Sequence, residues 1–402
     1  MKQKLAIVGV FLTAVSLILF FATKGKKEPA PQGGKSDPGE VRPVTAPVAA
    51  PTPVPAGEAT ELTFLYSTEK QDWVQNAVAG FMQAHPQIKV TLVGKGSLDA
   101  SAGILDGSLK PTLFSPADTL IANLLADDWS TKTGKQLYAS EPQPLLLSPL
   151  VFAVWQDRAE VLTAKTGGVL TWKAIREAVI SPKGWPAVGG KPAWGFVKLG
   201  QTDPTRSNSG LQALLSMTLE YYNKTSGVTV EELLDEKYQR WIKDIQRAVG
   251  KFEASTGTFM TDMIRFGPSK YDIALVYESL AVSQLENAQG RWGSLRLYYP
   301  PTTLWSDHPV MLLQTESLTP AQRAAGEQLI AYLRSTPVQA TALRYGFRPA
   351  DPNVPMKVTE GPDPFAKLAQ YGLNLELPAA ATAPDGAVVR NLLTMWSRVM
   401  AR

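Results

Sequence analysis

Apolar and polar positions after the first sixty residues alternate in short runs that predict strands separated by helices. Residues 61–66 alternate and are rich in strand formers, residues 88–93 repeat this pattern, and a third apolar run ends at Phe114. Apolar residues at helical spacing fill the two intervals between these runs. A β-α-β-α-β succession predicts an α/β domain whose sheet is mainly parallel.

Similar signals continue to the end of the chain. Further strands are predicted at residues 145–155, 272–277, 295–300 and 309–314. Helices are predicted at residues 211–218, 231–249, 321–334 and 388–401. Because strands and helices keep alternating and no fixed repeat occurs, the pattern favours an α/β protein throughout its folded part.

The amino terminus has the pattern of a membrane signal. An uncharged run of 18 residues extends from Leu5 to Ala22, with lysines on both sides. At about 1.5 Å per residue it spans about 27 Å, close to the hydrocarbon thickness of a bilayer. Bulky residues precede any cleavage point near Ala22, which favours an uncleaved signal anchor at residues 1–22 over a cleaved signal peptide. We therefore expect a single-pass transmembrane helix.

Residues 23–57 form a proline-rich segment with eight prolines. Such a segment buries too little apolar surface to fold and favours extended polyproline II structure. At about 3.1 Å per residue it reaches on the order of 100 Å. It is typical of a linker that holds a folded domain away from a bilayer, and a proline-rich ligand for a partner protein is the alternative.

Composition excludes several classes of function. The 402 residues include no cysteine and only two histidines, which excludes disulfide frameworks, thiolate metal sites and a lipid anchor on cysteine. Residues 1–56 hold 7 of the 40 Lys and Arg and 3 of the 36 Asp and Glu, which leaves 33 of each for the rest. The folded part therefore lacks the basic surplus of a nucleic-acid-binding protein, and we expect no metal and no cofactor.

Small polar residues are predicted at strand ends and before helices. Those near the ends of strands are Ser67, Thr68, Gly96, Ser97, Ser115 and Tyr277. Those before the helix at residues 211–218 are Thr205, Ser207, Asn208 and Ser209. Backbone N–H groups at a helix N-terminus, together with hydroxyls, bind an oxyanion without a countercharge. The same residue types also serve as simple helix caps, and this alternative stays open.

Several short segments share their order and spacing with one family. They are residues 81–90, 96–97, 114–118, 202–210, 276–277 and 346–349. Together they resemble bacterial extracellular solute-binding proteins of the type II periplasmic-binding fold, in particular the molybdate-, sulfate- and phosphate-binding branch. Thr112 stands where that branch carries an aspartate. The chain is also similar to solute-binding segments associated with von Willebrand A domains.

The resemblance implies two α/β lobes joined by crossing strands, with the ligand in the cleft between them. Lobe one is expected at residues 58–149 and 290–350, and lobe two at residues 150–289. Residues 351–402 are expected as a C-terminal extension that packs on lobe one. The small polar residues at strand ends and helix starts become the expected ligand-binding residues.

The implied function is a membrane-tethered extracytoplasmic receptor, in the periplasm or at the cell surface. It captures a small ligand, first of all an oxyanion, and delivers it to an ABC permease. A sugar or a cation stacked on a loop tryptophan is the competing ligand. The alternative function is a sensor or an interaction subunit of an envelope complex. No nucleic-acid partner is expected.

Residues 306–308 read Ser-Asp-His, the residue types of a hydrolase triad. Catalysis needs a base that is oriented by a third group and lies beside a nucleophile. Three contiguous residues before a strand rarely reach that geometry, so we expect no enzyme. Strand alternation places Glu278 on the side opposite Tyr277, away from the ligand.

Overall fold

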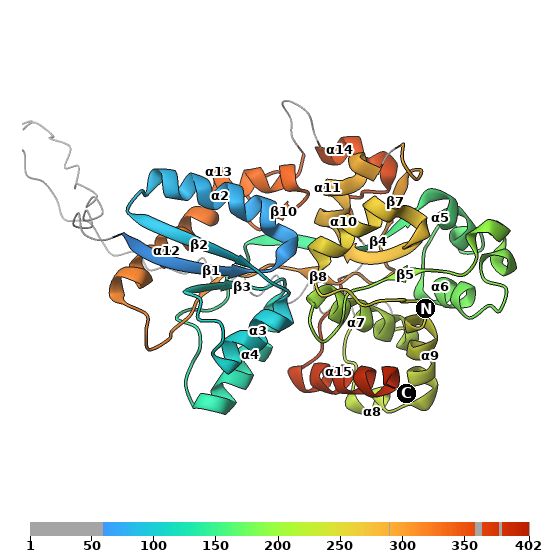
Figure 1. The fold of residues 1–402 in the computed structure, drawn as a ribbon, viewed down its shortest axis with the longest axis horizontal. Coiled ribbons are helices and arrows are strands. Elements are labelled where there is room, and N and C mark those ends of the chain that lie inside the picture. The colour runs from blue at the N-terminus through green and yellow to red at the C-terminus, as the bar shows by residue number, and fades with distance from the viewer. Residues whose placement is uncertain (1–58, 289, 358–363, 378–379, 402) are drawn as a thin grey trace, which may run out of the picture. The chain divides into compact units, whose positions relative to one another are not determined.

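The computed structural model describes residues 59–401, except for residues 289, 358–363 and 378–379 (Figure 1). The predicted anchor at residues 1–22 and the linker at residues 23–57 lie outside the described residues. Within the described part, no helix combines the length and apolar character that a membrane span requires.

Lobe one is built on a four-stranded sheet with the order β2-β1-β3-β9 (Figure 1). Its strands are β1 (Thr60–Tyr66), β2 (Ile88–Gly94), β3 (Leu113–Ser115) and β9 (Met311–Leu312). The first three strands are parallel, and β9 runs antiparallel to β3. The sheet is thus mainly parallel, as the alternation of strands and helices predicted.

Helices cover both faces of this first sheet. One face packs against α2 (Gln71–Ala84) and α12 (Pro320–Leu333), and the other against α3 (Ser97–Asp106) and α4 (Thr119–Thr133). The turn η1 (Thr68–Lys70) joins β1 to α2, while α13 (Thr336–Thr341) and η5 (Ala342–Tyr345) follow α12. Phe64 and Trp73 are fully buried in this core, and each such side chain stabilises the fold by about 1.5–3 kcal/mol.

Lobe two is built around the long strand β4 (Leu146–Trp155). Its other strands are β5 (Leu199–Gly200), β6 (Ile273–Tyr277), β7 (Leu295–Tyr298), β8 (Trp305–Ser306) and β10 (Arg348–Pro349). Phe152 belongs to one core and the adjacent Ala153 to another, so β4 is buried on both faces. A strand buried on both faces reads as one continuous apolar run, which made it predictable from sequence.

The helices of lobe two include the two that were predicted, at residues 211–218 and 231–249, and the second of these is broken. The helices of this lobe are α5 (Gln156–Thr163), α6 (Trp172–Val179), α7 (Asn208–Tyr222), α8 (Val230–Leu233), α9 (Glu236–Gln246), α10 (Thr256–Phe266) and α11 (Glu278–Ala288), with short turns η2 (Trp185–Val188), η3 (Pro192–Trp194) and η4 (Gly267–Ser269). The single helix predicted at residues 231–249 is divided at Asp235. Its carboxylate accepts the N–H of Lys237 at 2.7 Å and so starts α9 as a new helix.

The C-terminal extension contains α14 (Pro364–Leu368), η6 (Ala369–Tyr371) and α15 (Gly386–Met400). It was expected on lobe one, but α15 packs mainly against α8 and α9 of lobe two, with a smaller contact to α4 (Figure 1). Its apolar face, which includes Val389 and Leu392, lies in the same core as Tyr238 of α9. Trp396 Nε1 donates to Gln246 Oε1 at 2.9 Å. The contact between the apolar face of α15 and this core explains why α15 packs mainly on lobe two.

The boundary between the lobes also differs from the expected one. Residues 290–300 were assigned to lobe one, but β7 pairs with the second half of β4, with Leu295 opposite Trp155. The first half of β4 pairs with β8, after which the chain returns to β9 in lobe one. The chain therefore crosses between the lobes along β4 and again between β8 and β9.

A buried ion pair lies on the far side of the crossing strands. Glu278 points away from Tyr277, as alternation predicted, and accepts from Arg348 Nε and Nη2 at 2.8 Å each. Arg348 Nη2 also donates to the carbonyl of Asn374 at 2.6 Å. The pair thus joins α11, β10 and the C-terminal extension.

We predict that Arg348→Met destabilises the protein by about 3–5 kcal/mol, because it removes the charged partner of the buried Glu278 carboxylate and leaves only the Tyr299 hydroxyl donating to it. Adding Glu278→Gln should recover part of this loss. Arg334→Met, at an exposed arginine that ends α12, is the control and should change stability little. Urea unfolding measures all four proteins, and a loss below about 1 kcal/mol in Arg348→Met would contradict the prediction.

Candidate functional site

The register of lobe one brings three predicted loops to one edge of the sheet. Tyr66 at the end of β1 pairs with Gly94 of β2 and with Ser115 of β3. Because these parallel strands end together, the residues after each of them gather at the same edge. Tyr277, at the end of β6, approaches this edge from lobe two, where its ring lies 5.6 Å from that of His308.

A fully buried lysine lies at the centre of this edge. Lys70 Nζ donates to Ser67 Oγ at 2.5 Å and to the carbonyl of Pro116 at 3.1 Å. It also lies 3.8 Å from Glu69 Oε1 and 3.5 Å from His308 Nδ1. His308 Nδ1 is 3.1 Å from Glu69 Oε1, and Ser67 Oγ donates to the same oxygen. The predicted Ser67 therefore bridges two buried charges.

The charges in this cluster are set by their neighbours. Burial alone would raise the pKa of Glu69, but Lys70, His308 and Ser67 outweigh it and lower that pKa to about 2. Burial lowers the pKa of Lys70 to about 8, against the opposing charges of Glu69 and Asp307. Burial and the charge of Lys70 also lower the pKa of His308. At neutral pH the cluster thus holds a carboxylate, an ammonium and a neutral imidazole.

Lobe two contributes a second set of buried polar groups. Asn208 Nδ2 donates to the Tyr277 hydroxyl at 3.1 Å and to Ser306 Oγ at 3.4 Å. Burial raises the pKa of Tyr277 well above its usual 10, so its phenol stays protonated. Gln212 Nε2 donates to Asp118 Oδ2 at 2.5 Å, a hydrogen bond that connects α7 of lobe two with the start of α4 in lobe one.

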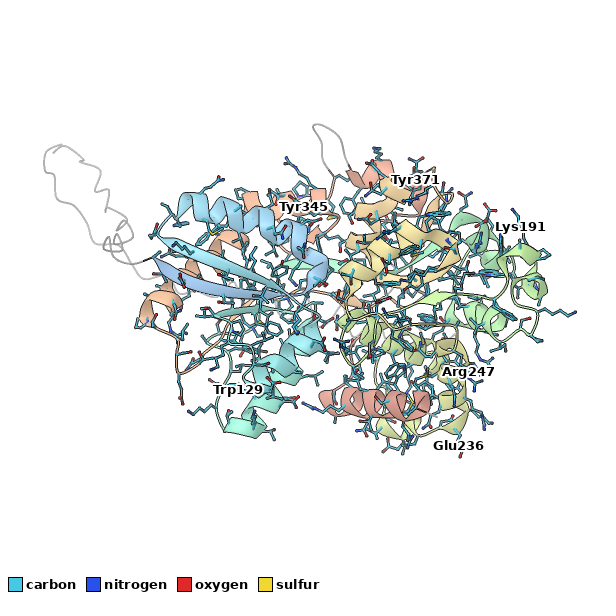
Figure 2. All side chains as sticks on the ribbon, viewed as in Figure 1. Trp129, Lys191, Glu236, Arg247, Tyr345 and Tyr371 are labelled. Carbon is cyan, nitrogen blue, oxygen red and sulfur yellow. The ribbon has the colours of Figure 1, made fainter. Side chains whose placement is uncertain are left out.

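Several buried polar atoms in the described part have no hydrogen-bond partner, and four of them surround this interface. They are Thr68 Oγ1, Ser115 Oγ, Asn208 Oδ1 and His308 Nε2, whereas the fifth, Trp129 Nε1, lies on α4 (Figure 2). A buried polar atom without a partner costs about 1–3 kcal/mol, so such atoms are rare in folded proteins. Their concentration between the lobes marks this region as a candidate binding site.

Two other predicted residues have structural partners. Ser97 Oγ accepts the N–H of Ala117 at 3.0 Å, and the N–H of Asp99 in the same helical turn donates to the carbonyl of Arg206 at 3.2 Å. A side chain on Gly96 would come within 2.9 Å of that carbonyl oxygen. Arg206 also forms an ion pair with Asp99 at 2.7 Å. The N-terminus of α3 thus already donates a hydrogen bond to a backbone carbonyl of lobe two.

The remaining predicted residues of lobe two form their own cluster. Ser209 Oγ lies 2.7 Å from Thr202 Oγ1 and 2.6 Å from Thr256 Oγ1, and Ser207 Oγ lies 3.3 Å from Thr256 Oγ1. Thr205 is exposed, and its hydroxyl donates to Asp203 at 2.6 Å. The hydroxyls of Ser207 and Ser209 thus join the starts of α7 and α10.

The side chains of residues 306–308 each contact a different residue. Ser306 Oγ donates to Gln212 Oε1 at 3.2 Å, and the Asp307 carboxylate accepts from the Thr119 N–H at 2.8 Å. His308 faces Glu69. The three residues therefore do not form the relay from acid through base to nucleophile that a hydrolase triad requires.

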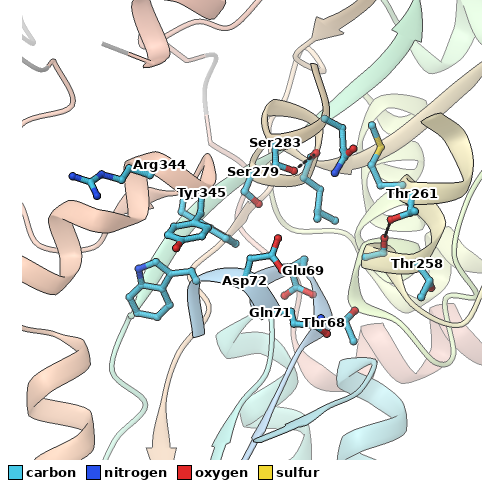
Figure 3. A pocket seen from close by; sticks show the side chains of 16 residues that line it. Thr68, Glu69, Gln71, Asp72, Thr258, Thr261, Ser279, Ser283, Arg344 and Tyr345 are labelled. Carbon is cyan, nitrogen blue, oxygen red and sulfur yellow. Dashed lines mark hydrogen bonds between the residues drawn. The ribbon is translucent and has the colours of Figure 1, made fainter. Parts of the chain in front are cut away.

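A cavity of about 410 Å³ opens beside the buried cluster (Figure 3). Lobe one contributes η1 and the start of α2, lobe two contributes α10 and α11, and η5 closes a third side. Thr68 and Glu69 belong both to the cavity wall and to the strand end that holds the cluster. The cavity and the cluster therefore adjoin at Thr68 and Glu69.

Sequence reasoning missed the charged residues of this site. Glu69, Lys70 and Asp72 follow the predicted Ser67 and Thr68 directly, yet they resemble the solvated first turn of a helix. The available signal was their position, since a charged pair between a buried strand and its helix lies at the ligand edge of a parallel sheet.

Comparisons with solved structures place the fold in a known class. The two-lobed arrangement is similar to the periplasmic thiamin-binding protein (TM-score 0.60, 14% identity, 87% of this chain and 99% of that chain). It is also similar to the sulfate-binding protein SubI from Mycobacterium tuberculosis H37Rv (TM-score 0.52, 17% identity, 80% of this chain and 93% of that chain). A third similar structure is the periplasmic binding protein AfuA from Actinobacillus pleuropneumoniae with fructose-6-phosphate bound (TM-score 0.53, 14% identity, 85% of this chain and 97% of that chain). These likenesses show the type II periplasmic-binding fold.

The family follows from the sequence match. The family described as bacterial extracellular solute-binding protein matches residues 62–348, more than half of the chain, so the chain belongs to this family. Proteins of this family bind small molecules and work with ABC permeases outside the cytoplasm. A search of curated proteins finds no significant match. None of these matches bears on the resemblance to segments associated with von Willebrand A domains.

We predict a specific pH dependence from Glu69. Its folded pKa of about 2 lies below the ordinary 4.5, so its ionised form stabilises the fold above pH 4.5 and loses this effect as pH falls towards 2. The stability gap between the wild type and Glu69→Gln should narrow by about 2 kcal/mol between pH 6 and pH 3.

Urea unfolding across that pH range measures the gap. Glu327→Gln, at an exposed glutamate of α12, is the control and should follow the wild-type profile. A gap of constant size for Glu69→Gln would show that the Glu69 carboxylate gains nothing from Lys70 and His308.

Proposed function

We propose that this protein is an extracytoplasmic receptor that captures a small polar solute between its lobes for uptake through an ABC-type permease. The supporting observation is the cavity of about 410 Å³, whose walls come from both lobes and from η5. Small-molecule sites usually measure about 300–1,000 Å³ and combine apolar walls with a few polar groups. A solute in this cavity would contact both lobes at once and favour their closed arrangement.

The lining suits a polar organic solute. Six hydroxyl-bearing residues line the cavity, and they come from η1, α10, α11 and η5: Thr68, Thr258, Thr261, Ser279, Ser283 and Tyr345. Apolar contacts come from Met260, Leu280 and Phe347. The structural neighbours include proteins described as binding sulfate, thiamin and fructose-6-phosphate. The fold therefore accommodates solutes of different charge, and the side chains of each site decide between them.

An oxyanion is the second candidate ligand. It is favoured by the free hydroxyls of Thr68 and Ser115 at the ligand edge and by the buried ammonium of Lys70. Against it, the N-terminus of α3 already donates to a carbonyl of lobe two, and Lys70 is paired with Glu69. An anion would have to displace one of these partners.

The membrane tether is part of the proposal. An anchor at residues 1–22 and a linker at residues 23–57 would keep the receptor near the permease and let it reach on the order of 100 Å. Amino-terminal sequencing of the protein from the membrane fraction should find Met1 or Lys2. A mature chain that begins between residues 23 and 57 would contradict the retained anchor.

We predict that a solute raises the thermal stability of the purified protein. A ligand that binds only the folded state adds about 2.7 kcal/mol at a hundred times its dissociation constant. Thermal unfolding against a panel of amines, amino acids, sugars and oxyanions measures the effect. Ser283→Trp, which fills the cavity from α11, should abolish the response.

The control for this experiment lies on the same helix. Asn287 is exposed one turn after Ser283 and does not line the cavity, so Asn287→Trp should keep the response. If no compound stabilises the protein, or if Ser283→Trp responds like the wild type, solute capture in this cavity is wrong. A sensor or interaction role for the same fold would then be favoured.

A further inference from the structure

The Glu69 carboxylate uses only one of its two oxygens within the protein. Ser67 Oγ, His308 Nδ1 and Lys70 Nζ all contact Oε1. No described residue bonds Oε2, although Glu69 is only 8% exposed and lines the cavity. An ion pair with Lys70 explains why the residue is charged, but it leaves the second oxygen without a partner. Because Glu69 lines the cavity, this oxygen is a hydrogen-bond acceptor available to a ligand there.

Hydroxyls on the opposite wall also present acceptors. Thr258 Oγ1 donates to the carbonyl of Ser255 at 3.1 Å. Thr261 Oγ1 donates to that of Gly257 at 3.2 Å, and Ser283 Oγ to that of Leu280 at 2.9 Å (Figure 3). A hydroxyl has one hydrogen to donate and two lone pairs. Because each of these three hydrogens is already used, Thr258, Thr261 and Ser283 offer oxygens to a donor on a ligand, whereas Thr68 Oγ1 has no partner in the described part.

The charges that face the cavity are mainly negative. Asp72 lines it together with Glu69 and has no ion-pair partner among the described residues. Arg344 is the cationic residue of the lining, and its side chain extends away from the two carboxylates (Figure 3). Lys70 is fully buried behind Glu69 and donates to Ser67 and Pro116. The Glu69 carboxylate stays ionised at neutral pH because its pKa is about 2.

From this arrangement we infer that the solute is a small organic cation whose ammonium or guanidinium group binds the free oxygen of Glu69. The inference rests on the proposed function and names the class of its ligand. A charged donor and a carboxylate form a short, strong hydrogen bond, especially where water is scarce. Tyr345, Met260 and Leu280 supply aromatic and apolar contacts for the carbon part of the cation. The described residues contain no group of three or more acidic or histidine side chains that could hold a metal ion.

Calorimetric titration of the full-length protein with single compounds tests the inference. The cationic probes are choline, agmatine and 1,4-diaminobutane, and the comparison probes are sulfate, phosphate, molybdate and glucose. We expect at least one cation to bind and Glu69→Gln to weaken it about tenfold to a hundredfold, the usual effect of losing a hydrogen bond between charged groups. Glu327→Gln, the same change at an exposed site outside the cavity, should bind the cation like the wild type.

A second variant keeps the test decisive if Glu69→Gln does not fold. Asp72 is exposed, so Asp72→Asn should fold normally and weaken cation binding about twofold to fivefold at low salt, with less effect at high salt. The inference is overturned if no cation binds, or if a cation binds and neither substitution weakens it.

The outcomes also separate this inference from the receptor function. Sulfate, phosphate, molybdate or glucose that binds the wild type but not Ser283→Trp would leave the receptor function standing and would overturn the cationic ligand. A cation that binds the wild type but not Ser283→Trp supports both. If no probe of any class binds, the cationic ligand is overturned here, and the broader thermal-stability panel decides on the receptor.

Discussion

The buried ammonium of Lys70 is the constraint on which the ligand edge of lobe one depends. Moving a charged amine out of water costs several kcal/mol unless hydrogen bonds and an opposite charge compensate it. Lys70 has no exposed surface, and its nitrogen finds Ser67 at the end of β1, the Pro116 carbonyl after β3 and the Glu69 carboxylate nearby. One atom therefore fixes two strand ends of lobe one. Any movement that separated them would leave a charge without partners in the protein interior.

The same constraint extends to the second crossing between the lobes. His308 has a φ of +41°, a left-handed conformation that costs a non-glycine residue about 1–2 kcal/mol. It is held there because its N–H donates to the Ala117 carbonyl at 3.1 Å and its ring faces Glu69. The rings of Tyr277 and Phe347 lie against it with centroids at 5.6 and 5.2 Å. The segment that joins β8 to β9 is thus attached to the buried charges.

The fold could be predicted from sequence where short-range patterns decide it. The apolar run of β4 and the alternation of β1 and β2 identify strands, because burial on one or both faces leaves a periodic signal. The position of α15 could not be predicted, because an amphipathic pattern shows that a helix buries one face but not which core it packs against. The break at Asp235 was missed because a single capping residue interrupts an otherwise continuous helical pattern. Family resemblance indicated two lobes and a cleft, and it placed Ser67, Thr68, Ser115 and Tyr277 near that cleft.

The ligand class is harder to predict, because residue type does not tell which atoms remain free. Ser97, Ser67 and Ser115 are all serines at strand or helix ends, yet the structure uses them differently. Ser97 receives an N–H from Ala117, and Ser67 bridges Lys70 and Glu69, whereas Ser115 has no partner for its hydroxyl. A hydroxyl can favour an anion only if its hydrogen is still available, and the same hydroxyl favours a donor once that hydrogen is used. Recognition at this site therefore depends on the hydrogen-bonding capacity left after the protein has satisfied its own buried groups. The residues that form hydrogen bonds to these buried groups therefore also determine which class of solute the cavity binds.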